Sequence, residues 1–225
     1  MVANETKPAG APQPETERIE RLVAWGKANS RNLTIAGLAV LIVAAGVWFM
    51  MAARGRREAF AERELNQARA SAEVGNLPLA ASDLSRIVDN YGGTAAGNQA
   101  SLLRGQVRLL QGQPTLAVSE LQQFIARGPQ PHYKAQAYGL LGSALEQAKD
   151  FKAAGDAYEQ AAKASPYPLV SGQMLLSAGR AYTTAGDTAA AANVYQKALS
   201  DHPDTPIATE AELRLGELGR FGASE

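Results

Sequence analysis

The sequence predicts an all-α protein in which one transmembrane helix is followed by an α-solenoid of about four helix pairs and a C-terminal capping helix. Two observations support this fold class. A pattern of small and large residues recurs every 37 residues from Ala68 onward, and a long uncharged apolar stretch precedes it. A fixed period of roughly 20–50 residues is typical of stacked structural units that bury a continuous core between them.

Each repeat unit combines a small residue on its first helix with a small and a large residue on its second. The first-helix position holds Ala68, Gly105, Gly142 and Gly179. The second-helix positions hold Ala80, Ala117, Ala154 and Ala191, followed four residues later by Leu84, Leu121, Tyr158 and Tyr195. Small residues allow two helices to approach closely, and the large residue fills the space beside them. We therefore expect Gly142 and Ala154 to face each other at a close helix crossing.

The third and fourth units carry the most complete pattern. The third reads Tyr138-x2-Leu141-Gly142-x2-Leu145, then Ala154-x3-Tyr158-x2-Ala161, and then Pro166. This pattern resembles the tetratricopeptide repeat, and the resemblance implies pairs of antiparallel helices in which a proline ends each second helix. A generic helical bundle with chance spacing is the alternative. It is disfavoured, because five equivalent positions recur at the same spacing across four units. The period exceeds the usual length of about 34 residues.

The domain organisation follows from this period and from changes in composition. We expect a disordered tail at 1–14, a juxtamembrane amphipathic helix at 15–31, a transmembrane helix at 32–53 and a tetratricopeptide repeat domain at 54–225. The repeats are placed at about 61–97, 98–134, 135–171 and 172–208, with a cap at 209–220. Helices are expected near 15–29, 32–72, 77–90, 94–111, 114–127, 133–148, 151–164, 171–185, 188–201 and 205–219.

The apolar stretch has the length and composition of a membrane span. No residue between Arg31 and Arg54 is charged. Residues 33–53 rise by about 1.5 Å each as a helix, which matches a bilayer core of about 30 Å. Trp25 and Trp48 are expected to lie at the membrane interfaces. A cleaved signal peptide is the alternative, and the length and late start of the stretch favour an uncleaved anchor. Basic residues are balanced on the two sides, so charge does not orient the helix.

The segment before the span has the pattern of an amphipathic helix. Ile19, Leu22 and Val23 fall on one stripe, and charged residues occupy the rest of the surface. This spacing is typical of a helix that lies at a membrane surface. An ordinary juxtamembrane helix without a partner is the alternative.

The sequence contains little that would support chemistry. It has no cysteine, a net charge of zero and two histidines, His132 and His202, which lie far apart in proline-flanked loops. No metal-ligand spacing, nucleophile motif or phosphate-binding loop is present. We therefore expect no enzymatic activity, cofactor, metal, nucleic acid or small-molecule substrate. Acidic residues such as Glu146, Asp156 and Glu159 are interpreted as solvated helix faces.

Protein binding is the remaining class of function. The first helices of tetratricopeptide repeats line an inner groove, and this resemblance implies a peptide-binding groove. Its expected residues are Leu65, Arg69, Gln99, Leu102, Gln106, Gln136, Ser143, Gln173, Leu176 and Arg180. Glutamines can hydrogen-bond a peptide backbone and leucines can contact apolar side chains, although tolerated surface positions would give the same pattern. Gln136, Gly139, Leu140 and Ser143 do not match the Lys, Asn and Arg set of a carboxylate clamp.

The overall layout is similar to one bacterial family. Residues 18–25, which read Arg-Ile-Glu-Arg-Leu-Val-Ala-Trp, are followed by the span and then by the repeats. This order resembles the ancillary subunit of the SecYEG translocon. The resemblance implies a single-pass inner-membrane protein with a periplasmic repeat domain. Its implied partners are the translocon, chaperones or exported client proteins. The alternatives are a structural scaffold for a cell-envelope complex, in cell-wall division or outer-membrane assembly, and an adaptor that faces the cytoplasm.

Overall fold

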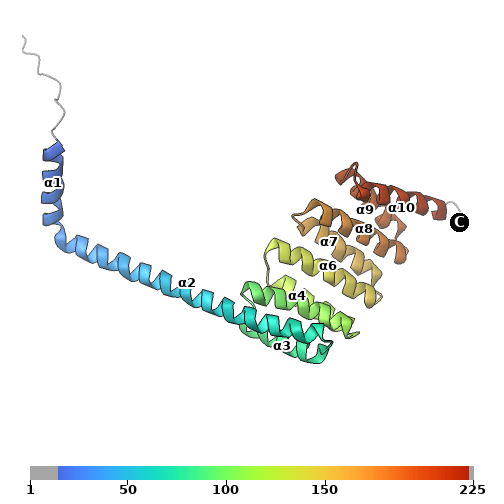
Figure 1. The fold of residues 1–225 in the computed structure, drawn as a ribbon. Coiled ribbons are helices and arrows are strands. Elements are labelled where there is room, and N and C mark those ends of the chain that lie inside the picture. Colours follow the sequence, from blue (N-terminus) through green and yellow to red (C-terminus); the bar gives the residue numbers. More distant parts are fainter. Residues whose placement is uncertain (1–14, 223–225) are drawn as a thin grey trace, which may run out of the picture. The chain divides into compact units, whose positions relative to one another are not determined.

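The computed structural model describes residues 15–222, which form ten helices and no strand (Figure 1). The helices are α1 (Glu15–Ala28), α2 (Ser30–Glu73), α3 (Leu77–Tyr91), α4 (Ala95–Leu110), α5 (Pro114–Ala126), α6 (Pro131–Gln147), α7 (Phe151–Ala164), α8 (Pro168–Thr184), α9 (Thr188–Asp201) and α10 (Pro206–Gly222). The predicted all-α solenoid is confirmed. The expected tail at 1–14 lies outside the described residues. The chain divides into two compact units, Met1–Gly55 and Arg56–Glu225.

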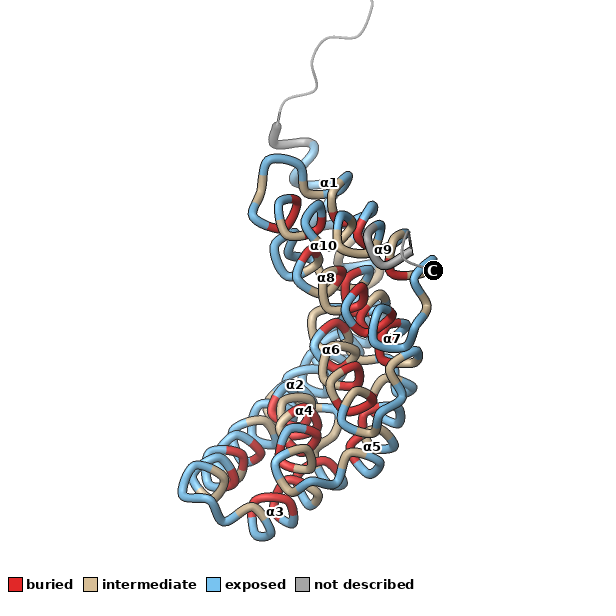
Figure 2. Tube along the Cα trace, turned by 90° about the vertical axis from the view of Figure 1, so that its right-hand side faces the viewer, coloured by how far each residue is buried: buried red, intermediate tan, exposed pale blue. Residues whose placement is uncertain are grey.

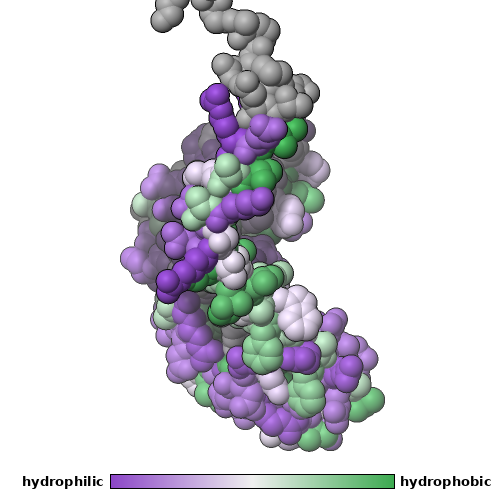
Figure 3. All heavy atoms as spheres, turned by 90° about the vertical axis from the view of Figure 1, so that its left-hand side faces the viewer, coloured by the Kyte–Doolittle hydropathy of each residue, from purple (hydrophilic) through white to green (hydrophobic). Residues whose placement is uncertain are grey.

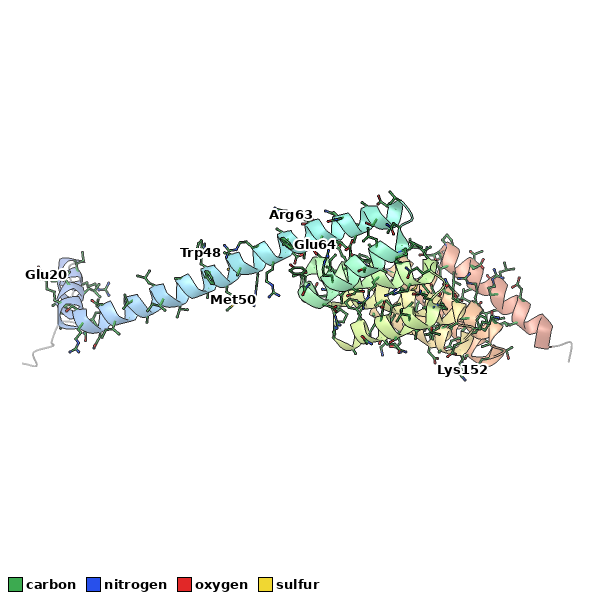
Figure 4. The ribbon with its side chains drawn as sticks, turned by 90° about the horizontal axis from the view of Figure 1, so that it is seen from below. Glu20, Trp48, Met50, Arg63, Glu64 and Lys152 are labelled. Atoms are coloured by element: carbon green, nitrogen blue, oxygen red, sulfur yellow. The ribbon has the colours of Figure 1, made fainter. Side chains whose placement is uncertain are left out.

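Helix α2 is the one helix in the described part of the chain that is long and apolar enough to cross a membrane. Its apolar side chains are exposed, including Trp48 at 71% and Met50 at 55%. Figure 4 shows both side chains projecting outward from α2. Exposed hydrophobic side chains are also visible in green in Figure 3. Trp25, near the end of α1, is 58% exposed.

The C-terminal part of α2 is the first helix of the first repeat. Ala61, Leu65 and Ala68 are buried there against α3 and α4. Upstream of them, the two carboxylate oxygens of Glu58 accept the N–H groups of Ala95 (2.9 Å) and Ala96 (2.8 Å). A carboxylate at a helix N-terminus satisfies N–H groups that have no partner within the helix. The prediction that this helix continues from the apolar stretch into the first repeat is confirmed.

The remaining repeats are the pairs α4/α5, α6/α7 and α8/α9, with α10 as the last helix. First helices of consecutive repeats pack against each other, as α4 does with α6 and α8 does with α10. The turns inside the pairs are equivalent. The second residue after each first helix has a positive φ, at Gly75 (80°), Gly112 (68°), Lys149 (64°) and Gly186 (78°). A left-handed residue at this position ends a helix and turns the chain.

The next residue in each turn begins the second helix as its N-cap. The side chains of Asn76, Asp150 and Asp187 each accept an N–H group from the first turn of the following helix. Gln113 occupies the same position before α5 but makes no such bond. Its backbone angles, φ −111° and ψ 58°, are close to those of Asp150, −92° and 73°. The second repeat therefore lacks one capping interaction that the others have.

Restoring this cap should stabilise the protein. Gln113→Asp places a short acceptor at the position where Asp150 and Asp187 cap their helices, so we expect a gain of about 0.5–1 kcal/mol. The measurement is the midpoint of urea unfolding of the chain in detergent micelles, followed by circular dichroism. Gln122→Asp, in the exposed middle of α5, is the control and should give no gain. An unchanged midpoint for Gln113→Asp would show that this turn is not equivalent to the others.

Small first-helix residues are covered by large second-helix side chains. A Cβ atom built on Gly142 would lie 2.6 Å from Cε1 of Tyr158, and one on Gly105 would lie 2.9 Å from Cδ2 of Leu121. The Tyr158 ring, one turn after Ala154 on α7, is thus the group nearest to Gly142. Ala117, Ala154 and Ala191 are fully buried in the same core. In Figure 2 the buried positions lie where helices of the repeats face one another.

Helices α2, α6 and α8 begin earlier than the sequence indicates, α2 at Ser30 instead of about 32. Helix α6 starts at Pro131 instead of about 133, and α8 starts at Pro168 instead of about 171. Proline is favoured in the first helical turn, because its fixed φ suits the helix and its missing N–H would have no partner there. The prolines that were read as part of the inter-repeat loops therefore belong to the helices that follow.

A charged cluster lies between α4 and α5. Arg104 is only 8% exposed. Its Nε atom is 3.1 Å from Oε2 of Glu120, and Arg108 lies 3.4 Å from the other oxygen. Neither Arg104 Nε nor Glu120 Oε2 has a hydrogen bond of good geometry, so charge attraction is the main interaction between them. Burial lowers the pKa of Arg104, and the nearby Glu120 carboxylate opposes that shift.

Candidate functional site

Four cavities follow one another along the face formed by the first helices of the repeats. Their volumes are about 460, 700, 310 and 270 Å³. Gln106 and Gln136 line both the first and the second cavity. Arg180 lines the second, third and fourth. We call this continuous strip the groove, and its residues include Arg69, Gln99, Leu102, Gln106, Gln136, Ser143, Gln173, Leu176, Arg180 and Arg214.

The largest cavity has an apolar wall and a polar end. Its wall includes Leu102, Leu140, Val170 and Met174, which come from α4, α6 and α8. Its polar end includes Ser143, Glu146, Tyr158 and Arg180. A concave site with an apolar wall and a few convergent polar groups is the usual form of a binding pocket.

The polar end is organised by Tyr158. Its hydroxyl donates to Glu146 Oε2 at 2.8 Å and lies 3.1 Å from Ser143 Oγ. Burial raises the pKa of the Tyr158 hydroxyl to about 12, and Glu146 adds to this shift while Ser143 opposes it. Tyr158 therefore stays protonated at neutral pH. It holds Glu146 in place at the edge of the cavity.

A second tyrosine joins neighbouring repeats in the same way. Tyr182 on α8 donates its hydroxyl proton toward Asp156 Oδ1 (2.6 Å) and Glu159 Oε1 (2.7 Å), both on α7. Burial and these two carboxylates raise the pKa of Tyr182. The interpretation of Glu146 and Glu159 as solvated helix faces is therefore wrong, because both are partly buried and accept a hydrogen bond from a buried tyrosine. Asp156 is exposed as expected, and it also accepts the Tyr182 hydroxyl.

The cations of the groove differ in their partners. Arg214 pairs with Glu210 at 2.8 Å and with Glu217 at 3.0 Å. Arg69 donates to Asn66 and Gln99. The ion pairs of the described residues do not include Arg180, whose guanidinium donates to the Ser177 hydroxyl at 3.0 Å. Arg214 is thus neutralised by its own helix, while Arg180 keeps a net positive charge in the groove.

The structure places the expected groove residues unequally. Leu65 is 1% exposed and packs with Ala61 and Ala68, so its assignment to the groove is wrong. Leu102 is 6% exposed but lines two cavities. The other expected residues all line at least one cavity. Leu65 is buried because it packs in one apolar cluster with residues of α3 and α4.

Sequence reasoning missed several residues of the largest cavity. Met174 stands at a repeat position where the other units have alanine, Ala100, Ala137 and Ala211, so the period alone did not select it. Leu140 and Val170 do have large equivalents, Leu103 and Ile207, but these positions were not among the expected groove residues. Tyr167 and Val170 also line the cavity from the start of α8, a segment read as a loop. The proline at 168 could have indicated the early helix start. Within residues 15–222, no group of three or more His, Cys, Asp and Glu side chains could hold a metal ion.

The fold and the groove define an α-solenoid of helix pairs that presents a concave surface. The chain belongs to the Tetratricopeptide repeat-like domain family, whose pattern matches residues 24–204. No curated protein matches the chain. Proteins of this fold are typically interaction modules and not enzymes.

Solved structures with low sequence identity share this fold. The TPR-like repeats of a putative kinesin light chain from Podosopora anserina are 16% identical, with a TM-score of 0.55, 73% of this chain covered and 87% of that one. PilF from Pseudomonas aeruginosa is 17% identical, with a TM-score of 0.53 and coverages of 75% and 71%. MamA is 19% identical, with a TM-score of 0.53 and coverages of 72% and 88%.

Proposed function

We propose that this protein is a membrane-anchored interaction module that binds segments of other proteins in the groove. The continuity of the groove carries this proposal, because four cavities that share residues form one strip along the first helices. Exposed glutamines at equivalent positions, Gln136 and Gln173, can pair with a peptide backbone without requiring a particular sequence. The apolar cavity between them adds contact area for side chains.

The apolar helix supports the anchoring part of the proposal. The exposed stretch of α2 has the length and hydropathy of a bilayer span, so lipid suits its apolar side chains. α2 then crosses the membrane once. Its C-terminal part is the first helix of the solenoid, so the first repeat begins directly at the membrane surface.

We propose further that the module acts at the site of protein export in the bacterial inner membrane, with its repeats in the periplasm. The resemblance of residues 18–25 and of the overall layout to the ancillary translocon subunit supports this assignment. The ligands are then newly exported chains or the chaperones that receive them. A groove that recognises backbone with few specific contacts suits such varied ligands.

Photo-crosslinking in intact cells tests this function. A photoreactive residue at Gln136 or Gln173 in the groove should crosslink to many newly exported chains. The matched control is Gln122, an exposed glutamine on α5 that lines none of the four cavities. Crosslinks to one protein in fixed stoichiometry would instead indicate a scaffold of an envelope complex. Protease that digests the repeats only after the inner membrane is opened would place them in the cytoplasm and overturn the export assignment.

A further inference from the structure

We propose that the largest of the four groove cavities receives a large apolar side chain of an extended peptide, and that Arg180 binds a carboxylate of the same peptide. This inference rests on the function proposed above and names the chemistry of its ligand. We call this site the Gly139 cavity. It is lined by Leu102, Gly139, Leu140, Met174 and Arg180.

The cavity exists where the repeat pattern lacks one side chain. Leu65, Leu102 and Leu176 stand at the same repeat position, and the third unit has Gly139 there. The only atom within 4 Å of a Cβ built on Gly139 is Met174 Sδ, at 3.3 Å. The first-helix glycines at the close crossings differ from Gly139. A Cβ on Gly142 or Gly179 would collide with a tyrosine ring, and one on Gly105 would collide with Leu121. Gly139 thus lies on the wall of the open cavity, where the flexible Met174 side chain is the one group that approaches it closely.

The walls of this space are suited to an apolar group. Leu140 and Met174 are partly buried hydrophobic residues that pack on the core beside it, and Leu102 closes its other side. The cavity holds about 700 Å³, which is large enough for a leucine or phenylalanine side chain with its backbone. Met174 is flexible, so the wall can adapt to different apolar shapes.

Charge complementarity defines the second feature of the ligand. Arg180 stands where the Gly139 cavity meets the next cavity of the groove. Among the described residues it has no ion-pair partner, while the carboxylates near it are occupied. Glu210 and Glu217 bind Arg214, and Glu146 binds Tyr158. An arginine on a partly enclosed surface binds a carboxylate by charge-assisted hydrogen bonds. The ligand should therefore carry Asp, Glu or a C-terminal carboxylate close to its apolar residue.

The test uses labelled peptides and the full chain in lipid nanodiscs. The probes are fluorescein-labelled peptides of Gly, Ser and Asn that carry one Phe and one Asp, with the two residues one to four positions apart. Reference peptides replace Phe by Ser or Asp by Asn. Fluorescence anisotropy measures the dissociation constants. We expect the best-spaced peptide to bind about tenfold more tightly than either reference peptide.

Two variants separate the two features. Gly139→Leu restores the residue of the other units and fills the cavity, so it should weaken binding by about tenfold or more while the protein stays folded. Gly216→Leu is the matched control, because a Cβ at Gly216 meets no atom within 4 Å. Arg180→Gln should weaken the Asp peptide about tenfold and leave the Asn peptide unchanged, which a purely structural effect would not do.

Each alternative result overturns the inference. Equal affinity of Gly139→Leu and the wild-type chain would show that the cavity does not bind the peptide. Equal affinity for the Asp and Asn peptides would show that Arg180 does not bind the carboxylate. Loss of self-association in Gly139→Leu, seen by sedimentation, would make a second copy the occupant. If no peptide binds while Gln136 and Gln173 still crosslink in cells, this ligand chemistry is wrong and the proposed function stands.

Discussion

Gly179→Ala should destabilise the protein by about 2–3 kcal/mol, whereas the equivalent change 37 residues later, Gly216→Ala, should stabilise it. A Cβ atom at Gly179 would lie 2.3 Å from Cε1 of Tyr195, whose side chain is 1% exposed. A buried ring cannot move aside without opening the core, so the added methyl group overpacks the crossing. At Gly216 no atom lies within 4 Å of the new Cβ. Alanine there should stabilise α10 by about 0.5–1 kcal/mol.

The comparison of these two variants tests the packing of the repeats directly. Both glycines are helical and stand at the same repeat position, so helix propensity acts equally on them and only the neighbouring ring differs. Chemical unfolding of the chain in micelles measures both. Shifts of the same sign would contradict the position of Tyr195. A third variant, Gly179→Ala with Tyr195→Leu, should recover part of the loss, because the smaller side chain makes room for the methyl group.

Glu120→Ala should lower the stability by about 3–5 kcal/mol, the largest single loss expected at a charged residue. The change leaves Arg104, which is 8% exposed, without its ion-pair partner, so that Asp89 is the one carboxylate that still attracts its buried charge. Arg108 loses the same partner. An uncompensated buried charge costs far more than a missing surface pair, because the protein interior cannot replace the solvation by water.

An exposed ion pair gives the control. Lys152 lies 3.2 Å from Asp187, and its side chain is 70% exposed. Figure 4 shows this lysine on the outside of the repeats. Lys152→Gln should change the stability by less than about 0.5 kcal/mol. Replacing both buried partners, as in Glu120→Leu with Arg104→Met, should recover most of the loss from Glu120→Ala. Equal effects of Glu120→Ala and Lys152→Gln would show that Arg104 is solvated in solution.

The site could be predicted only in part. The period correctly indicated that one residue of each first helix faces the groove, because equivalent positions in stacked units share an environment. It did not reveal that Leu65 is buried, because its contacts with α3 and α4 form only in the folded core. The pairing of Glu146 and Glu159 with tyrosines also depends on contacts between separate helices. The spacing of charged residues along the sequence does not predict such contacts.

The amino-acid sequence determined the fold class, the helix order and the turn positions, because these depend on local properties. These properties are the periodic small residues, the turn glycines and the uncharged apolar run. Each of them affects the structure within a few residues or within one repeat. The tertiary structure alone decided which side chains of different helices contact each other. The Gly139 cavity illustrates this difference. A glycine in a repeat can mark a close approach, as at Gly142, or an open space, as at Gly139. Only the position of the neighbouring side chains distinguishes the two, because packing density is a property of the folded core.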